Sequence, residues 1–293
     1  MQFKSKSYRV FRVINGIVLT ILTLICLLPL LHVLALSLSD AVAANSNSVH
    51  FFPKGLNFSA YKLIFSNHAF LRAFGVSVLR TVTGCGLALA MVILTAYPLS
   101  LQDKDLKGRK VITWYFVLPM LISGGLVPTY ITIKQLGLID NFLVYILPGC
   151  VPTYYVILMM NFFRGISRSL RESASIDGAD EFTILLRIML PLSLPSIATI
   201  ALFSAVGHWN EWFNAMIYMN GQELWPLQTL MRSMLLRIEE TLFDAGEIAE
   251  LSKLSSKSFQ AAQVIFAIVP IMCVYPFLQR YFISGMTLGS VKE

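Results

Sequence analysis

Charged residues are scarce in this sequence. Asp, Glu, Lys and Arg together make up 13% of the 293 residues, against about 25% in an ordinary soluble domain. Hydrophobic residues make up 56%, where a soluble domain has about 45 to 50%. So little charge cannot cover the surface of a soluble enzyme, and the composition therefore argues against one.

Patterns that bind metals or nucleotides are also missing. The four cysteines lie inside uncharged stretches at no ligand-like spacing, so we expect neither disulfides nor a metal site. No clustered carboxylate motif indicates a membrane enzyme, and the chain has no G-x-x-x-x-G-K-[ST] phosphate loop. We therefore expect no catalytic residue, no metal ligand and no cofactor in this chain. The cysteines are Cys26, Cys85, Cys150 and Cys273.

Six long uncharged runs stand out instead. Each has 22 to 27 residues, enough for a helix to cross a bilayer core of about 30 Å. The first run is too long for the apolar core of a cleavable signal peptide, so we expect it to remain as the first span. The sequence predicts an all-α integral membrane protein with six transmembrane helices in one domain, residues 13–283. The runs are Val13–Ser39, Thr81–Gln102, Val111–Ile133, Asn141–Phe163, Ile188–Asn210 and Ser258–Gln279.

The charges between the runs separate by side. The two tails and the second and fourth loops carry 14 basic and 7 acidic residues, whereas the other three loops carry nine of each. The whole excess of +7 therefore lies on the side of the termini. By the positive-inside rule we expect the N-terminal tail, residues 1–12, and the C-terminal tail, residues 284–293, to be cytoplasmic.

Two features inside the runs leave alternatives open. Prolines and glycines interrupt the third and fourth runs; they either mark a translocation path or reflect the general frequency of these residues in membrane helices. Arg80 starts the second run, and we favour a side chain that extends outward to the interface over one that faces the helix bundle. The interrupting residues are Pro119, Gly124, Gly125, Pro128, Pro148, Gly149 and Pro152.

The loop between the fourth and fifth runs has the pattern of a helical hairpin. Residues 172–177 favour a helix, Gly178 suits the positive φ of a helix end, and Asp180 with Glu181 suits the start of the next helix. Phe182, Leu185 and Leu186 then fall on one apolar face. The features alone fit either a docking element or an amphipathic loop that lies on the lipid headgroups.

The spacing of this loop resembles the EAA loop of permease subunits in bacterial ABC importers. That motif reads E-A-A, three residues, G, nine residues, I-x-L-P, and only Ser173 departs from it, as one small residue for another. Further stretches resemble the maltose-type carbohydrate branch and its MalG-like subunits, and one resembles permeases for polysaccharides or complex oligosaccharides. The stretches that resemble the MalG-like subunits are Phe52–Tyr61, Ala96–Ser100, Leu106–Lys110, Trp209–Trp212 and Gly285–Lys292. The stretch that resembles the polysaccharide or complex-oligosaccharide permeases is Ser123–Tyr130.

The resemblance implies the type I ABC importer permease fold, located in the bacterial cell membrane, with residues 164–195 as a cytoplasmic coupling loop. It also implies a second permease subunit as partner in a heterodimer, two ATPase subunits that bind ATP and Mg, and an extracytoplasmic solute-binding protein. The substrate would be a carbohydrate, and nucleic acid is not expected as a partner. The residues expected to couple to the ATPase are Glu172, Ser173, Ala174, Asp177, Gly178, Ile188, Leu190 and Pro191.

Aromatic and amide side chains near the fourth and fifth runs are the candidates for a substrate path. Sugar binding needs aromatic faces and hydrogen-bonding groups, although a position in an interfacial belt or between helices explains such residues equally well. The candidates are Tyr154, Tyr155, Asn161, His208, Trp209, Asn210 and Asn214. An ion-coupled secondary transporter of a small solute is the alternative function. It would need ionisable residues in mid-membrane, where the runs offer only His32 and His208.

Overall fold

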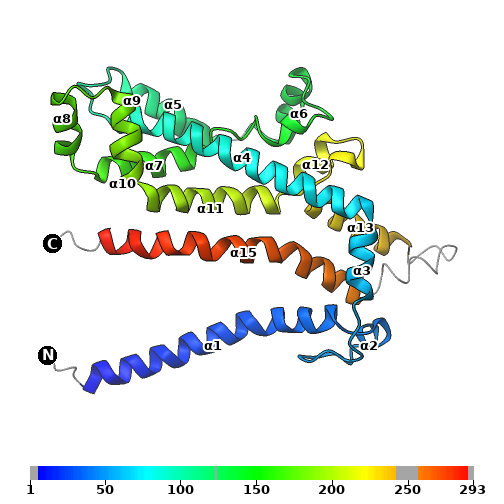
Figure 1. The fold of residues 1–293 in the computed structure, drawn as a ribbon. Helices are drawn as coiled ribbons and strands as arrows, with labels where there is room; N and C mark the ends of the chain where they lie inside the picture. The colour runs from blue at the N-terminus through cyan, green and yellow to red at the C-terminus, as the bar shows by residue number, and fades with distance from the viewer. Residues whose placement is uncertain (1–5, 123, 242–256, 290–293) are drawn as a thin grey trace. The chain divides into compact units, whose positions relative to one another are not determined.

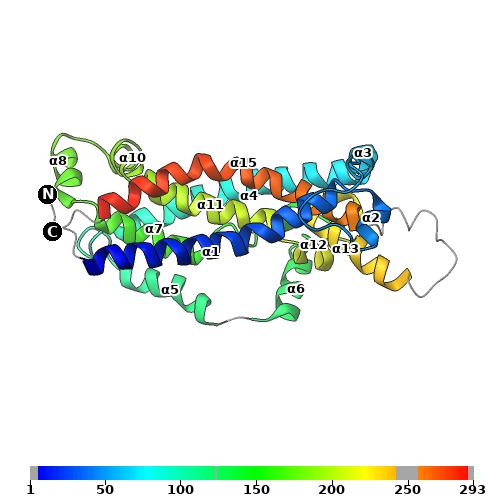
Figure 2. The ribbon, with the colours of Figure 1, turned by 90° about the horizontal axis from the view of Figure 1, so that it is seen from below.

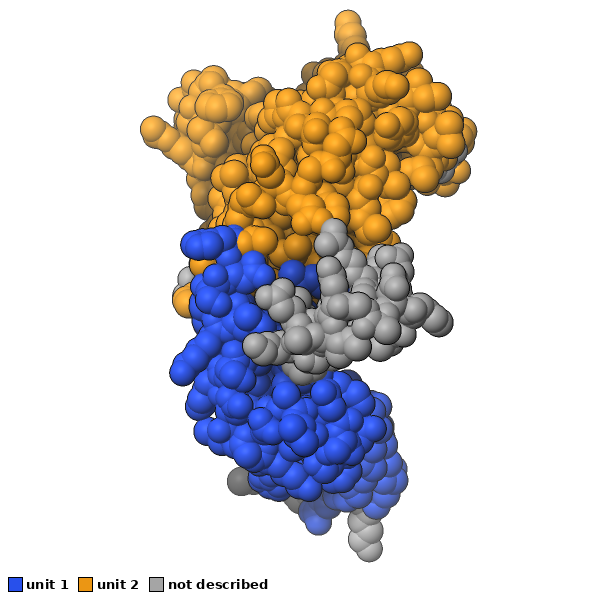
Figure 3. Space-filling view, turned by 90° about the vertical axis from the view of Figure 1, so that its right-hand side faces the viewer, with its two compact units in different colours: residues 1–68, 234–269 blue, residues 69–233, 270–293 orange. Residues whose placement is uncertain are grey.

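The structure, a computed structural model, describes residues 6–122, 124–241 and 257–289. All regular elements in these ranges are helical (Figure 1). The chain divides into two compact units, one of residues 1–68 with 234–269 and one of residues 69–233 with 270–293 (Figure 3). The all-α fold expected from the sequence is therefore confirmed for the described residues.

The first unit contains α1 (Lys6–Ser37), α2 (Ala41–Asn45), α3 (Ser59–Ser66) and the first part of α15 (Lys257–Gly289). The apolar side chains of α1 are exposed along most of its length, so this helix requires lipid or another chain around it. The side chain of Asn57 accepts a hydrogen bond from the Ser59 amide at 2.8 Å and forms an Asx turn directly before α3.

The second unit holds most of the described helices and contains two apolar cores. Its elements are α4 (His68–Ser100), α5 (Arg109–Leu121), α6 (Leu126–Gln135), η1 (Phe142–Tyr145), α7 (Thr153–Gly165), α8 (Arg168–Ile176), α9 (Glu181–Ile184), η2 (Leu185–Met189), α10 (Leu190–Leu192), α11 (Leu194–Asn210), α12 (Phe213–Tyr218), η3 (Gln222–Leu224), α13 (Leu227–Thr241) and the rest of α15. The first residue of α4 and the last part of α13 belong to the first unit. Figures 1 and 2 show α4, α7 and α11 running alongside one another.

Each core holds one end of this unit together. The first joins α4, α7, η2 and α11 through Val92, Val156, Met159, Leu185 and Ile200. The second joins α6, η1 and α12 through Ile133, Val144, Tyr145, Ala215 and Tyr218.

Contacts between loops support the predicted separation of sides. Arg171 in the fourth loop forms an ion pair with Asp105 in the second, with Nη1 and Oδ2 2.9 Å apart. The Asp140 amide of the third loop donates to the carbonyl of Tyr218, after the fifth run, at 2.9 Å. Loops assigned to the same side thus meet each other. The assignment of one side to the cytoplasm stays a prediction.

The number of membrane spans also stays a prediction. Among the described residues, three helical stretches are long and apolar enough to cross a membrane, Ser7–Ser37, His68–Ser100 and Lys257–Phe277. Counting two bent helix pairs gives up to five. The fourth predicted run is divided between η1 and the 13-residue α7. At 1.5 Å per residue such a helix covers about 20 Å, less than a bilayer core of about 30 Å.

The structure has helix breaks at Gly125 and Pro152, whereas Pro119 and Pro128 lie inside α5 and α6. α5 ends at Leu121 and α6 begins at Leu126 after Gly125, whose φ is +82°. α7 begins directly after Pro152. Residues 6–12 and 284–289 of the predicted tails continue α1 and α15. Residues 1–5 and 290–293, which include the end of the Gly285–Lys292 match, lie outside the described residues, as does Ser123.

Candidate functional site

The coupling loop, residues 164–195, folds into the helical hairpin that its sequence predicts. α8 ends in a Schellman motif, because the amide of Gly178 donates to the carbonyl of Ser175 at 3.2 Å and that of Ala179 to Ala174 at 3.0 Å. Gly178 has a φ of +84°, which glycine adopts without the steric cost of a Cβ. The chain then reverses and begins α9 at Glu181.

Four of the predicted coupling residues, Glu172, Ser173, Asp177 and Gly178, are exposed on the hairpin. The Glu172 carboxylate accepts from Arg168 Nη2 at 3.2 Å, one helical turn earlier, and its side chain is 58% exposed. It therefore remains accessible to a partner. Ala174 differs from these four because it packs against the first apolar core.

The remaining predicted residues lie where the loop returns to the helix bundle. Ile188 and Leu190 are half-buried and Pro191 is exposed. Pro191 has no amide hydrogen and its ring would clash with the carbonyl of Arg187 in a regular α-helix, and η2 directly before it is a π-helical turn. Such turns accommodate disrupted hydrogen bonding. An 80° bend follows between Glu181–Leu192 and Leu194–Asn210.

The expectation of a single apolar face in this segment is wrong. Leu185 is 4% exposed and belongs to the first core, whereas Phe182 and Leu186 are 59% and 46% exposed. The first core covers Leu185 and not its two apolar neighbours. Two apolar side chains are therefore left on the surface.

Arg171 connects α8 to the rest of the second unit. Besides its bond to Asp105, its Nη2 lies 2.6 Å from Glu181 Oε1, and the Tyr97 hydroxyl of α4 donates to the same carboxylate. The hydrogen bond from Arg171 holds the pKa of Asp105 below its ordinary value. The two carboxylates in turn raise the pKa of Arg171. No local spacing in the sequence indicates this network, because Asp105 lies 66 residues from Arg171.

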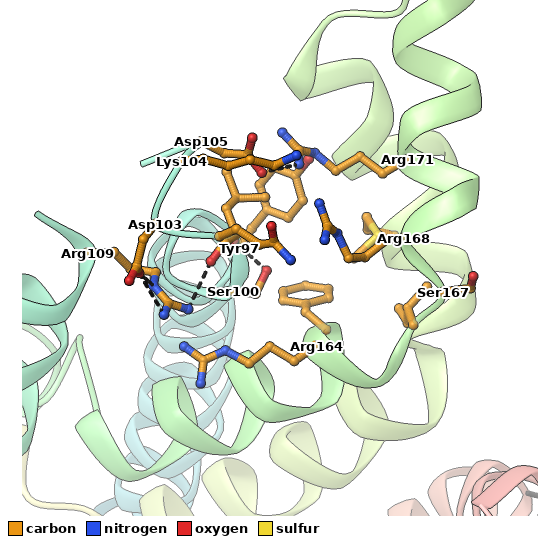
Figure 4. A pocket seen from close by; sticks show the side chains of 15 residues that line it. Tyr97, Ser100, Asp103, Lys104, Asp105, Arg109, Arg164, Ser167, Arg168 and Arg171 are labelled. Atoms are coloured by element: carbon orange, nitrogen blue, oxygen red, sulfur yellow. Dashed lines mark hydrogen bonds and ion pairs between the residues drawn. The ribbon is translucent and has the colours of Figure 1, made fainter. Parts of the chain in front are cut away.

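A basic cavity of about 600 Å³ opens beside α8, where α4 and α7 end and α5 begins. Figure 4 shows arginine side chains that reach toward it from separate segments. Its charged lining residues are Asp103, Lys104, Asp105, Arg109, Arg164, Arg168 and Arg171. No single stretch of the sequence indicated it.

A second cavity, of about 230 Å³, gathers part of the predicted substrate path. Tyr155, His208 and Asn214 line it, together with residues that include Tyr145, Ser204 and Glu211. Tyr154, Asn161 and Asn210 are exposed and do not line this cavity. Trp209 is buried against Phe74, with ring centroids 5.8 Å apart. The structure thus brings together Tyr155, His208 and Asn214 and separates the others from them.

The favoured outward position of Arg80 is wrong. Arg80 is 1% exposed and lines this second cavity. It forms an ion pair with Glu211, and its guanidinium carbon lies 4.5 Å from the centre of the Tyr145 ring. A buried guanidinium requires such partners. Glu211 lies 131 residues from Arg80 in the sequence, so the pattern of uncharged runs did not indicate that the two residues pair.

The chain is similar over nearly its whole length to bacterial permease proteins. It is 40% identical to Protein LplC of Bacillus subtilis, over 98% of this chain and 97% of that protein. It is 38% identical to the polygalacturonan/rhamnogalacturonan transport system permease protein YtcP of the same organism, over 94% of this chain and 95% of that protein. No protein-family model matches the chain.

A solved structure shares the fold. The crystal structure of a bacterial ABC transporter involved in the import of the acidic polysaccharide alginate contains a chain that matches with a TM-score of 0.85 and 29% identity, over 96% of this chain and 100% of that one. The resemblance found in the sequence is confirmed, and the chain belongs to the permease subunits of carbohydrate ABC importers.

Proposed function

We propose that this chain moves an oligosaccharide or polysaccharide fragment into the cytoplasm by alternating access, driven by separate ATPase subunits that bind its coupling loop. The observation that carries this proposal is the exposed hairpin of α8 and α9. It presents the accessible Glu172 carboxylate and the exposed side chains of Ile176 and Phe182. A surface with apolar groups and one charge suits a protein partner.

The contacts behind the hairpin suit it for transmitting movement. Arg171 ties α8 to Asp105 and Glu181, and Ala174 packs against the first core. A displacement of α8 would therefore carry α4 and α11 with it as a rigid body, which is one of the common mechanisms of switching between two states. In this mechanism Gly178 fixes the turn, and Ile188, Leu190 and Pro191 join the loop to α11.

The proposed assembly is a heterodimer with a second permease subunit, two ATPase subunits and an extracytoplasmic solute-binding protein, in the cell membrane of a bacterium. The exposed apolar surface of α1 supports contact with lipid or a second permease. A further solved structure with this fold, 16% identical with a TM-score of 0.57, is an alginate ABC transporter in complex with an alginate pentasaccharide-bound periplasmic protein. Six spans with both termini in the cytoplasm fit the charge distribution.

The second cavity is the candidate for the substrate path in this proposal. Tyr155 and Tyr145 offer aromatic faces, while His208 and Asn214 offer hydrogen-bonding groups. Sugars bind through this combination of apolar faces and hydrogen bonds. The names of the relatives support a carbohydrate, since YtcP is named for polygalacturonan and rhamnogalacturonan.

Reconstitution of the whole importer tests the proposal. The purified chain, its second permease and the ATPase subunits are placed in proteoliposomes with the binding protein, and ATP-dependent uptake of labelled oligosaccharides is measured. Glu172→Lys should abolish ATPase co-purification and uptake while the chain still inserts into the membrane. Arg187→Gln, in the same loop but outside the predicted coupling residues, serves as the control for removing a charge.

The alternative of an ion-coupled transporter predicts a different result. Uptake would then continue without ATP and would collapse when a proton or sodium gradient is removed. That outcome, or full uptake by Glu172→Lys, would overturn the proposed coupling.

A further inference from the structure

The basic cavity beside α8 carries more positive charge than its own carboxylates neutralise. Five cationic side chains line it against two carboxylates, which leaves an excess of three positive charges. They come from the loop after α4, the start of α5, the end of α7 and α8 (Figure 4). Cations gathered from separate segments indicate a site for an anion. The cations are Lys104, Arg109, Arg164, Arg168 and Arg171.

Three of these cations are already paired inside the chain, and Arg168 is one of them through Glu172. Arg171 lies between Asp105 and Glu181, and Arg109 pairs with Asp103 at 2.9 Å. Arg164 differs from them because it forms no ion pair with any carboxylate in the described part of the chain. Its guanidinium donates to the Leu99 carbonyl at 3.0 Å.

The contact with Leu99 shows that Arg164 also has a structural role. It satisfies a carbonyl at the end of α4, as Arg109 does at Leu101. This uses one of the five N–H groups of its guanidinium. Partial desolvation, followed by the nearby charge of Arg109, lowers the pKa of Arg164. The two neighbouring cations repel each other, and Asp103 offsets only part of this repulsion. A further anion beside Arg164 would reduce it.

Arg168 connects this cavity to the proposed docking surface. Its ion-pair partner is Glu172, one turn along α8, and Glu172 is the residue expected to pair with the ATPase. If Glu172 turns to the ATPase, Arg168 loses its partner and the positive charge at the cavity increases. By reciprocity, an anion that binds Arg168 would release Glu172 for docking.

The size and walls of the cavity indicate the chemical class of the ligand. A phosphate group carries up to two negative charges with three acceptor oxygens, and arginine binds it in a fork geometry. The volume of about 600 Å³ leaves room for a small organic group. Tyr97 and Phe163, packed edge to face at 5.9 Å, give that group an apolar wall.

We propose that the cavity binds a phosphate-bearing ligand between Arg164 and Arg168, and that its occupancy strengthens ATPase docking at α8. The second half of this statement rests on the proposed function. The phosphate belongs either to a soluble phosphate ester or to the headgroup of an anionic lipid, because both sources present the same chemistry at a membrane boundary.

The test measures binding directly. The complete importer is placed in nanodiscs of neutral phosphatidylcholine and titrated calorimetrically with glycerol 3-phosphate, with glycerol as the uncharged control. We expect glycerol 3-phosphate to bind and glycerol not to bind. Arg164→Gln should weaken binding about tenfold or more, since it removes the hydrogen bonds of a charged donor to the phosphate. Arg164→Lys should retain part of the binding, and Arg187→Gln should bind like the unchanged chain.

A second arm separates the two sources. The same complex in nanodiscs that contain phosphatidylglycerol is analysed by native mass spectrometry for retained lipid. Retained lipid that Arg164→Gln releases, and that glycerol 3-phosphate does not displace, identifies a lipid headgroup as the ligand. Thermal unfolding of each variant verifies that it is folded.

Three results would overturn the proposal. They are absence of binding in both arms, equal binding by Arg164→Gln and the unchanged chain, and loss of ATPase subunits from Arg164→Glu without any phosphate binding to the original complex. The last result would assign the cavity to an acidic segment of the ATPase. Because ligand binding is read without transport, a negative result here leaves the Glu172→Lys test of the proposed function intact.

Discussion

Arg80 and Glu211 are 131 residues apart in the sequence and joined in the structure by two hydrogen bonds. The guanidinium of Arg80 donates to the carboxylate of Glu211 and to its backbone carbonyl, the latter at 3.1 Å. The other carboxylate oxygen of Glu211 accepts from the amides of Phe213 and Asn214 at 2.7 and 2.9 Å. One side chain thus caps the start of α12 and holds α4 to the end of α11.

Removal of Arg80 should therefore destabilise the second unit. Arg80→Met leaves the Glu211 carboxylate without its cation in a partly buried place, and breaking such a pair costs about 3 kcal/mol. Thermal unfolding of the purified chain in detergent should show a clear decrease in midpoint. The double variant Arg80→Met with Glu211→Gln should recover part of the loss, because no unpaired charge remains.

Arg72 provides the matched control on the same helix. It is exposed, so Arg72→Met should change the midpoint little. Equal effects of Arg72→Met and Arg80→Met would contradict the importance of the Arg80 and Glu211 pair.

The effect of a substitution at Gly178 should follow the energetic cost of a positive φ for the new residue. At +84°, an alanine costs about 1 kcal/mol and a β-branched residue more, whereas asparagine adopts this region more readily. No neighbouring atom lies within 4 Å of an added Cβ, so backbone strain decides the effect. We expect ATPase co-purification to decrease in the order Gly, Asn, Ala, Val. Full co-purification with Gly178→Val would show that the turn is not required for docking.

The Asp105 and Arg171 pair predicts a loss of stability in acid. The pKa of the Asp105 carboxyl lies below the ordinary value of 3.8 because Arg171 donates a hydrogen bond to it. A lowered folded-state pKa stabilises the fold above the ordinary value, and this stabilisation is lost as the pH falls through the folded pKa. Since the pair lies at the surface, the effect is about 1 kcal/mol or less.

The measurement compares the unchanged chain with Asp105→Asn. The difference between their unfolding midpoints should be constant near neutral pH and should shrink between about pH 5 and pH 3. A difference that stays constant in acid would show that the carboxylate charge does not contribute.

Substitutions in the second cavity should separate substrate contact from folding. Asn214→Leu and Tyr155→Leu remove polar or aromatic groups that line it, and we expect uptake to fall about tenfold while ATPase co-purification is kept, as for loss of one or two hydrogen bonds. Asn161→Leu alters an exposed residue outside the cavity and should have little effect. Similar losses of uptake from all three variants would remove the cavity from the substrate path.

Local sequence patterns were sufficient for the hairpin of the coupling loop. Gly178 ends a helix where only a positive φ satisfies the last carbonyls, and Asp180 with Glu181 begins the next. These are interactions between residues a few positions apart, so the sequence contains all the information needed. The same holds for the helix breaks at Gly125 and Pro152, since a missing Cβ or amide hydrogen acts locally.

The position of Leu185 could not be predicted in this way. Helical spacing groups it with Phe182 and Leu186, yet it alone of the three lies in the first core. Which part of an apolar face is covered depends on the elements that pack against it, and these come from distant parts of the chain.

The sequence by itself determined that this chain is a helical membrane protein and which loop carries the permease motif, because composition and motif spacing are properties of the linear chain. Only the tertiary structure decided that Arg80 faces inward to Glu211 and that Tyr155, His208 and Asn214 share a cavity. It also decided that arginines from several segments line the basic cavity beside α8. Each of these depends on contacts between residues far apart in the sequence, which folding alone brings within a few ångströms.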